Sequence, residues 1–114
     1  MHELSIAQGL MADVLAEMKT HRIDAICKIG LSVGRLSGVV PDALRFCFEA
    51  ITKETTLAGA ELDIDWMNPS GLCSDCGHEF AVESLICICP ICASSSLTIE
   101  GGRDLTMTWL EVPE

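Results

Sequence analysis

The stretch that decides how this chain folds is CSDCGHEFAVESLICICPIC, residues 73–92. It opens and closes on a C-x-x-C motif, and residues 77–88 separate the two motifs. Two residues between thiolates let one turn present both sulfurs to one ion, and two such turns supply the four sulfurs of a tetrahedral zinc site. The spacing therefore predicts a zinc-ribbon-like module with four zinc ligands: Cys73, Cys76, Cys89 and Cys92.

Other interpretations of this cysteine cluster stay open at the level of sequence. Cys87 lies two residues before Cys89 and can replace it as a ligand, although the second motif would then lose its C-P-x-C form, so we treat Cys87 as a non-ligand. Free buried thiols, a redox dithiol and a rubredoxin-like iron site are the alternatives to zinc. A site closed by four thiolates leaves no position for water or substrate, which indicates a structural rather than a catalytic metal.

The number of cysteines and their compartment also favour a metal. The chain has seven cysteines in 114 residues, and five of them fall within residues 73–92. No basic and apolar leader opens the sequence, and no apolar run approaches the ~20 residues that span a bilayer. We therefore expect a cytoplasmic protein without a membrane segment, and disulfides are rare in that reducing compartment.

Outward from the module, hydrophobic periodicity predicts the remaining elements. Apolar residues recur at helical spacing over residues 4–18, and Pro41 suits the first turn of a second helix. Alternation predicts strands at roughly residues 25–33, 62–66 and 105–112. The expected fold is α+β: a small three-stranded sheet with two helices on one face, residues 1–68 and 102–114, and an inserted zinc-binding module, residues 69–101.

The charge of the chain argues against nucleic acid as a partner. Acidic residues number 17 against 7 basic ones, a net charge of −10, and no Lys or Arg lies between Ser70 and Gly102. Such a surface repels phosphate backbones and suits a basic protein surface instead. Because the sequence shows neither a nucleophile–base pair nor a phosphate-binding loop, we do not expect an enzyme.

The N-terminus, Met1-His2-Glu3, offers a second metal site. The terminal amine, the amide nitrogen of His2 and its imidazole Nδ1 can close adjacent chelate rings in one plane. Nitrogen-rich tetragonal coordination of this kind suits Ni(II) or Cu(II). By itself the motif is a weak signal, since a histidine near a chain end is usually just solvated.

Several segments in the same order resemble the HypA/HybF family of hydrogenase maturation nickel metallochaperones. They are MHELS at residues 1–5, ALRFCFE at 43–49, GAEL at 59–62, the two C-x-x-C motifs, and LEV at 110–112. The resemblance covers essentially the whole chain, and the additional Cys87 is its main departure from the family pattern.

The resemblance implies specific roles for the residues that match. His2 is similar to the family's essential nickel ligand, acting with the Met1 amine and a nearby backbone nitrogen, and Glu3 is the adjacent residue of that motif, contributing by its backbone or its carboxylate. The four cysteines match the family's zinc ligands. The family delivers nickel to the [NiFe]-hydrogenase large subunit with the GTPase HypB, and some members also serve urease. The alternative function is a zinc-ribbon adaptor that joins proteins without transferring metal.

Overall fold

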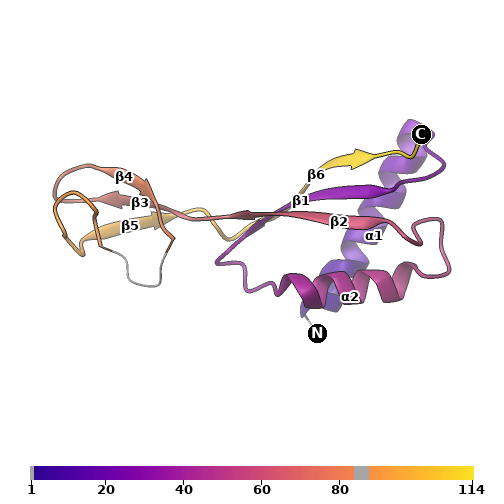
Figure 1. The fold of residues 1–114 in the computed structure, drawn as a ribbon, viewed down its shortest axis with the longest axis horizontal. Coiled ribbons are helices and arrows are strands. Elements are labelled where there is room, and N and C mark those ends of the chain that lie inside the picture. Colours follow the sequence, from indigo (N-terminus) through magenta and orange to yellow (C-terminus); the bar gives the residue numbers. More distant parts are fainter. Residues whose placement is uncertain (1, 84–87) are drawn as a thin grey trace. The chain divides into compact units, whose positions relative to one another are not determined.

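The computed structural model describes residues 2–83 and 88–114. Its elements follow the chain in the order α1, β1, α2, β2, β3, β4, β5 and β6 (Figure 1). Two helices and three strands belong to one part of the chain, and three short strands surround the two C-x-x-C motifs. The fold class predicted from the sequence is confirmed.

Helix α1 spans His2–His21 and is longer than the periodic stretch that predicted it. Glu3 lies in its first turn and Lys19 in its last, which complements the helix dipole at both ends. Beyond the last turn Arg22 takes a left-handed conformation with φ 54°, and the Ile23 N–H donates to the Met18 carbonyl at 2.8 Å. This hydrogen bond belongs to a Schellman-type ending, which satisfies carbonyls that the helix leaves unpaired.

Helix α2 spans Pro41–Thr52 and begins, as predicted, with its proline. Pro41 lacks the N–H that a first-turn residue would leave unpaired, so it costs nothing there. The Thr52 hydroxyl donates to the Phe48 carbonyl at 2.7 Å in the last turn. Thr52 is thus buried without leaving its hydroxyl unpaired.

The first sheet has the strand order β2-β1-β6, with β1 at Lys28–Gly34, β2 at Glu61–Met67 and β6 at Leu105–Glu111. The start of β2 bonds to the residue before β1 (Glu61 N–H to Cys27 O, 3.0 Å), so these two strands run parallel. The start of β1 faces the end of β6 (Cys27 N–H to Glu111 O, 2.9 Å), so this pair is antiparallel. Cys27, directly before β1, makes both hydrogen bonds, so β1 lies between β2 and β6.

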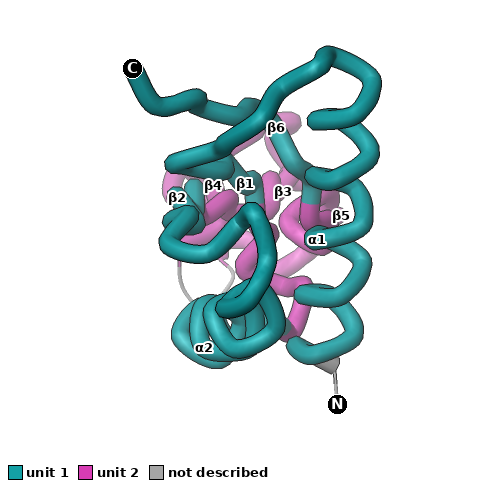
Figure 2. The backbone as a smooth tube through the Cα atoms, turned by 90° about the vertical axis from the view of Figure 1, so that its right-hand side faces the viewer, with its two compact units in different colours: residues 1–32, 39–65, 106–114 teal, residues 33–38, 66–105 magenta. Residues whose placement is uncertain are grey.

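The core lies between this sheet and the two helices, which pack against each other (Figure 2). Ile29 and Leu31 of β1 are at most 1% exposed, because β1 is the central strand and is covered on its helix side. The helices bury a stripe against it: Ala7, Leu10, Val14 and Met18 from α1, and Leu44 and Phe48 from α2. Burial of such side chains is the main stabilising contribution, about 1.5–3 kcal/mol for each large one.

The cysteine module contains a second sheet with the order β4-β3-β5. Strand β3 (Ser70–Cys73) pairs antiparallel with β4 (Glu79–Ala81) and with β5 (Leu97–Glu100). Its register sets Cys73 opposite Leu97. The start of the first C-x-x-C turn therefore lies beside the chain that leaves the second turn, which brings the two turns together.

The chain forms two compact units, one of residues 1–32, 39–65 and 106–114 and the other of residues 33–38 and 66–105 (Figure 2). The first holds the helices and the second holds the cysteine module. Across the described residues, no helix combines the length and apolarity needed to traverse a bilayer.

Candidate metal centre

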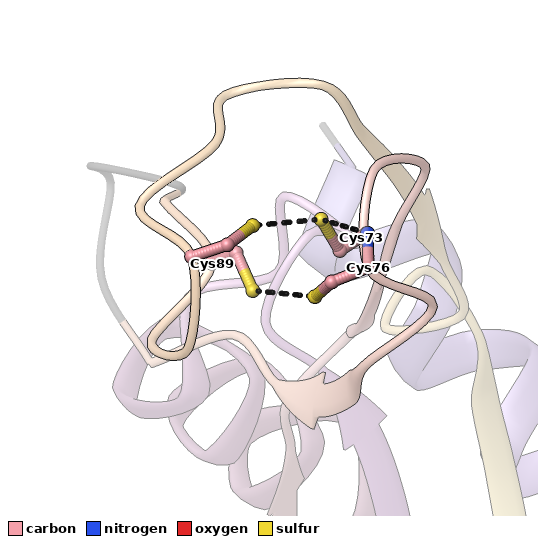
Figure 3. A group of neighbouring side chains, drawn as sticks. Cys73, Cys76 and Cys89 are labelled. Carbon is pink, nitrogen blue, oxygen red and sulfur yellow. Dashed lines mark hydrogen bonds between the residues drawn. The ribbon is translucent and has the colours of Figure 1, made fainter.

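The four cysteine sulfurs of the two C-x-x-C motifs gather at one point of the module. All four Sγ atoms lie within 4.8 Å of one another (Figure 3). The closest pairs cross from one motif to the other, Cys73 to Cys92 at 3.5 Å and Cys76 to Cys89 at 3.6 Å. Disulfide sulfurs lie ~2.05 Å apart, whereas four sulfurs at ~2.3 Å around a tetrahedral ion lie ~3.8 Å apart. The spacing therefore fits a shared metal ion and not disulfides.

The two turns that carry the cysteines have the same hydrogen-bond pattern. In the first, the Cys73 N–H donates to the His78 carbonyl and the Gly77 N–H donates to the Cys73 carbonyl, both at 2.9 Å. In the second, Cys89 makes the equivalent bonds with Ser94 and Ala93, again at 2.9 Å. Because both turns have the same backbone geometry, each presents its two sulfurs in the same way.

This turn geometry requires a left-handed residue directly after each second cysteine. Gly77 has φ 75° in the first turn and Ala93 has φ 61° in the second. Glycine adopts this conformation freely, while an L-residue with a Cβ pays about 1–2 kcal/mol for it. The sequence has alanine where such turns often have glycine, and Ala93 takes the strained left-handed conformation.

Backbone N–H groups supply the positive potential that the sulfurs need. The N–H of Cys76 lies 3.5 Å from the Cys73 sulfur, and this contact, with that of Asp75, lowers the Cys73 pKa to about 7 despite burial. For Cys89, burial raises the pKa, but the N–H groups of residues 91 and 92, together with the thiols of Cys76 and Cys92, outweigh it and the net shift is downward. Since residues 70–102 contain no Lys or Arg, these amides compensate the thiolate charge within the module.

The other two thiols hold their protons more tightly. At Cys92 the Ser94 N–H favours the thiolate, but interaction with the Cys73 sulfur, burial and the remaining thiols dominate and raise the pKa to about 12. The Cys76 pKa is raised as well, against the favourable contact with the His78 N–H. Each turn thus has one thiol with a lowered pKa and one with a raised pKa, and any thiol that is still protonated releases its proton to solvent when it binds the metal.

A polar link between the two turns was not evident from the sequence. The Ser94 hydroxyl donates to the Asp75 carboxylate and accepts the Ser96 N–H at 3.0 Å. The Ser74 N–H donates to the Ser96 carbonyl at 2.8 Å. The only signal for this link was the run of three serines directly after the second turn.

The other residues singled out by the sequence lie elsewhere. Met1 and Cys87 fall outside the described residues, and of His2 only the backbone, at the start of α1, is described. His21 is the last residue of α1, and its Nε2 lies 3.1 Å from Glu17 Oε2. The His78 ring stacks on Phe80 and is not among the clustered ligand atoms.

Comparisons with known proteins agree with this geometry. The family model described as "Hydrogenase/urease nickel incorporation, metallochaperone, hypA" matches residues 1–112. The hydrogenase maturation factor HypA of Chlorobium luteolum is 38% identical over 114 residues, covering 100% of this chain and 97% of the relative. HypA of Geotalea uraniireducens is 40% identical over 112 residues, covering 98% and 99%.

Solved structures with the same fold carry the same family name. A HypA solution structure aligns with a TM-score of 0.70 at 26% identity, covering 99% of this chain and 97% of the other. The nickel metallochaperone HypA from Helicobacter pylori aligns with a TM-score of 0.65 at 24% identity over 96% of both chains, which supports the fold. With its whole-chain family match, its relatives at 38–40% identity and its four-cysteine centre, the chain belongs to the HypA family of nickel metallochaperones for hydrogenase maturation.

Proposed function

We propose that this protein binds Ni(II) at its N-terminus and passes it on for insertion into [NiFe]-hydrogenase. The ligands are the His2 imidazole, the Met1 amine and a nearby backbone nitrogen, with Glu3 next to them. These donors favour the planar, nitrogen-rich coordination that Ni(II) prefers. A site built from few donors at a chain end can also exchange its metal, which delivery requires.

The observation that carries this proposal is that α1 begins at His2. The first four N–H groups of an α-helix have no partner within the helix. The amide nitrogen of His2 belongs to this group, so a nickel ion can take it without breaking a helical hydrogen bond. The helix also gives the exchangeable site a rigid base.

For the four-cysteine centre we propose a structural Zn²⁺ ion held by Cys73, Cys76, Cys89 and Cys92. Support comes from the sulfur spacing and from the closed ligand set, which leaves no open coordination position. Residues 69–101 then form the zinc-binding insertion, and residues 1–68 with 102–114 form the nickel-binding domain. Since the described residues of the module include few buried apolar side chains, metal binding contributes much of its folding free energy.

The family implies the rest of the pathway. We propose that the GTPase HypB and the hydrogenase large subunit are the partners, that urease maturation is a second destination, and that transfer takes place in the cytoplasm. The protein acts by binding and release and not by catalytic turnover. With a net charge of −10 it does not bind nucleic acid.

Nickel titration of untagged protein tests the N-terminal site. We expect His2→Ala to lose nickel binding while it retains one zinc per chain, and we expect an N-terminal extension that blocks the Met1 amine to have the same effect. Nickel binding should also weaken as the pH falls through the range in which imidazoles protonate. His21→Ala is the matched control, because His21 is an exposed histidine at the other end of the same helix.

Equal nickel affinity in wild type and His2→Ala would refute the N-terminal assignment and favour an adaptor that does not transfer metal. Elemental analysis of the same samples tests the cysteine centre. Iron with visible thiolate absorption in place of colourless zinc would refute the zinc assignment.

A further inference from the structure

The carboxylate of Glu3 contacts the start of the second helix. Its Oε2 accepts a hydrogen bond from the Val40 N–H at 3.3 Å. Glu3 lies in the first turn of α1, and Val40 is the N-cap residue of α2. One side chain therefore joins the N-terminal ends of two helices that are separated by the whole of β1 and its flanking loops.

The start of α2 has an acidic residue, Asp42, in its first turn but no side-chain hydrogen bond from its N-cap residue. Val40 has an extended conformation (φ −95°, ψ 111°) and no side chain that can accept a hydrogen bond. Pro41 has no N–H at all, and the first helical bond runs from the Leu44 N–H to the Val40 carbonyl at 3.0 Å. An anion next to a helix start is stabilised by the helix dipole, and Glu3 adds one from another element that also accepts the Val40 N–H.

The segment before α2 is well placed to hold this contact. Val39 is 6% exposed and anchors the chain in the core, whereas the Val40 side chain is 55% exposed. Gly38, with φ 79°, turns the chain immediately before them. The Val40 N–H therefore has a defined position relative to α1, and its bond to Glu3 restrains the first turn of α1 in return.

We propose that Glu3 is a positioning residue for the N-terminal nickel site and that its carboxylate is not a nickel ligand. This inference rests on the proposed nickel site at His2. Glu3 follows His2 directly, so restraining Glu3 restrains the backbone that carries the nickel donors. The bond also connects the terminus to residues 38–40, so that nickel binding alters the environment of the Val40 amide.

The chemistry of the donors separates this role from direct ligation. Nitrogen donors give Ni(II) a strong, planar ligand field, and a carboxylate oxygen in the first coordination sphere would weaken it. Replacing a ligand changes the visible spectrum of the bound ion. Replacing a residue that only positions the ligands lowers the affinity and leaves the spectrum as it was.

The experiment uses full-length untagged protein with Glu3→Gln, Glu3→Asp and the control Asp13→Asn. Asp13 is an exposed acid on the same helix, so its variant matches the charge change of Glu3→Gln. Two readouts are needed: the Val40 amide resonance in ¹⁵N–¹H spectra before and after nickel addition, and the affinity and visible spectrum of bound Ni(II).

In metal-free Glu3→Gln we expect the Val40 amide proton to move upfield as its charged acceptor is lost, with Asp13→Asn at the wild-type position. We expect the nickel affinity to fall by about tenfold with an unchanged spectrum, the usual size of a loss of ligand support. Glu3→Asp keeps the charge on a shorter side chain. Its Val40 amide shift and its nickel affinity should lie between those of wild type and those of Glu3→Gln. In wild type, nickel should shift the Val40 amide.

An unmoved Val40 resonance in metal-free Glu3→Gln would overturn the contact itself. An altered nickel spectrum would overturn the positioning role in favour of direct ligation, and an unchanged affinity would reduce Glu3 to a structural role. If His2→Ala binds nickel like wild type, the proposed nickel site fails and the role of Glu3 in it fails too. The metal-free Val40 measurement then still decides whether Glu3 joins the two helices.

Discussion

The two cysteine turns provide an internal experiment, because one has glycine and the other alanine at the same left-handed position. Gly77 has φ 75° and Ala93 has φ 61°. A Cβ added at Gly77 would have no heavy atom within 4 Å outside its chain neighbours, so only the backbone conformation distinguishes the two residues there. We therefore predict that Ala93→Gly strengthens the metal centre and that Gly77→Ala weakens it.

The magnitude follows from two opposing terms. The left-handed conformation costs an L-residue about 1–2 kcal/mol. Glycine avoids this cost, but it makes the unfolded chain more flexible. The greater entropy of the unfolded chain cancels about 0.4–1 kcal/mol of the advantage of glycine. The net effect is about 1 kcal/mol in each direction, or about fivefold in an equilibrium constant.

Competition with a zinc chelator measures this effect directly, because the turns become ordered when the metal binds. We expect Ala93→Gly to bind zinc about fivefold more tightly than wild type and Gly77→Ala about fivefold more weakly. Gly59→Ala is the control: Gly59 has φ 83° and nothing within 4 Å, but it lies in the unit that holds the helices. It should lower the melting temperature without changing zinc affinity.

The reasoning would be refuted if Ala93→Gly weakened zinc binding, or if Gly77→Ala left it unchanged. Either result would mean that the left-handed residues do not limit how well the turns close around the metal. Equal effects of Gly59→Ala and Gly77→Ala on zinc affinity would instead show that the measurement reports general stability.

Two further predictions concern proton release and the packing of the sheet. Because the Cys73 pKa lies at about 7 and the Cys89 pKa is also lowered, zinc binding should release at least about one more proton at pH 6 than at pH 8.5, so affinity falls more steeply with decreasing pH below 7 than above it. Calorimetry in buffers of different ionisation enthalpy counts these protons, and an equal count at both pH values would contradict the shift. A Cβ at Gly30 would overlap the indole of Trp109, so Gly30→Ala should destabilise the protein by about 1–3 kcal/mol. Thermal unfolding measures this loss. In the double variant with Trp109→Ala, the loss in free energy of unfolding should be smaller than the sum of the losses in the two single variants. Strict additivity of the two losses would exclude the overlap.

Periodicity predicted most of the first unit because most of its elements have one face more buried than the other. The helix at α1, the helix starting at Pro41 and the three strands of the β2-β1-β6 sheet all appear where apolar residues recur with the matching period. The three short strands of the cysteine module were not predicted individually. Strands of three or four residues are too short to show an alternating pattern.

The sequence by itself predicted the four cysteines that the structure brings together, because a C-x-x-C turn places two sulfurs together through local geometry alone. It also indicated the strain at Ala93, since that position in the turn is set by its distance from Cys89. Tertiary structure alone decided which contacts form between distant segments. The pairing of Cys73 with Leu97, the link from Ser94 to Asp75 and the bond from Val40 to Glu3 each join residues far apart in the chain. Such contacts follow from strand register and helix packing, and no local pattern of residues encodes them.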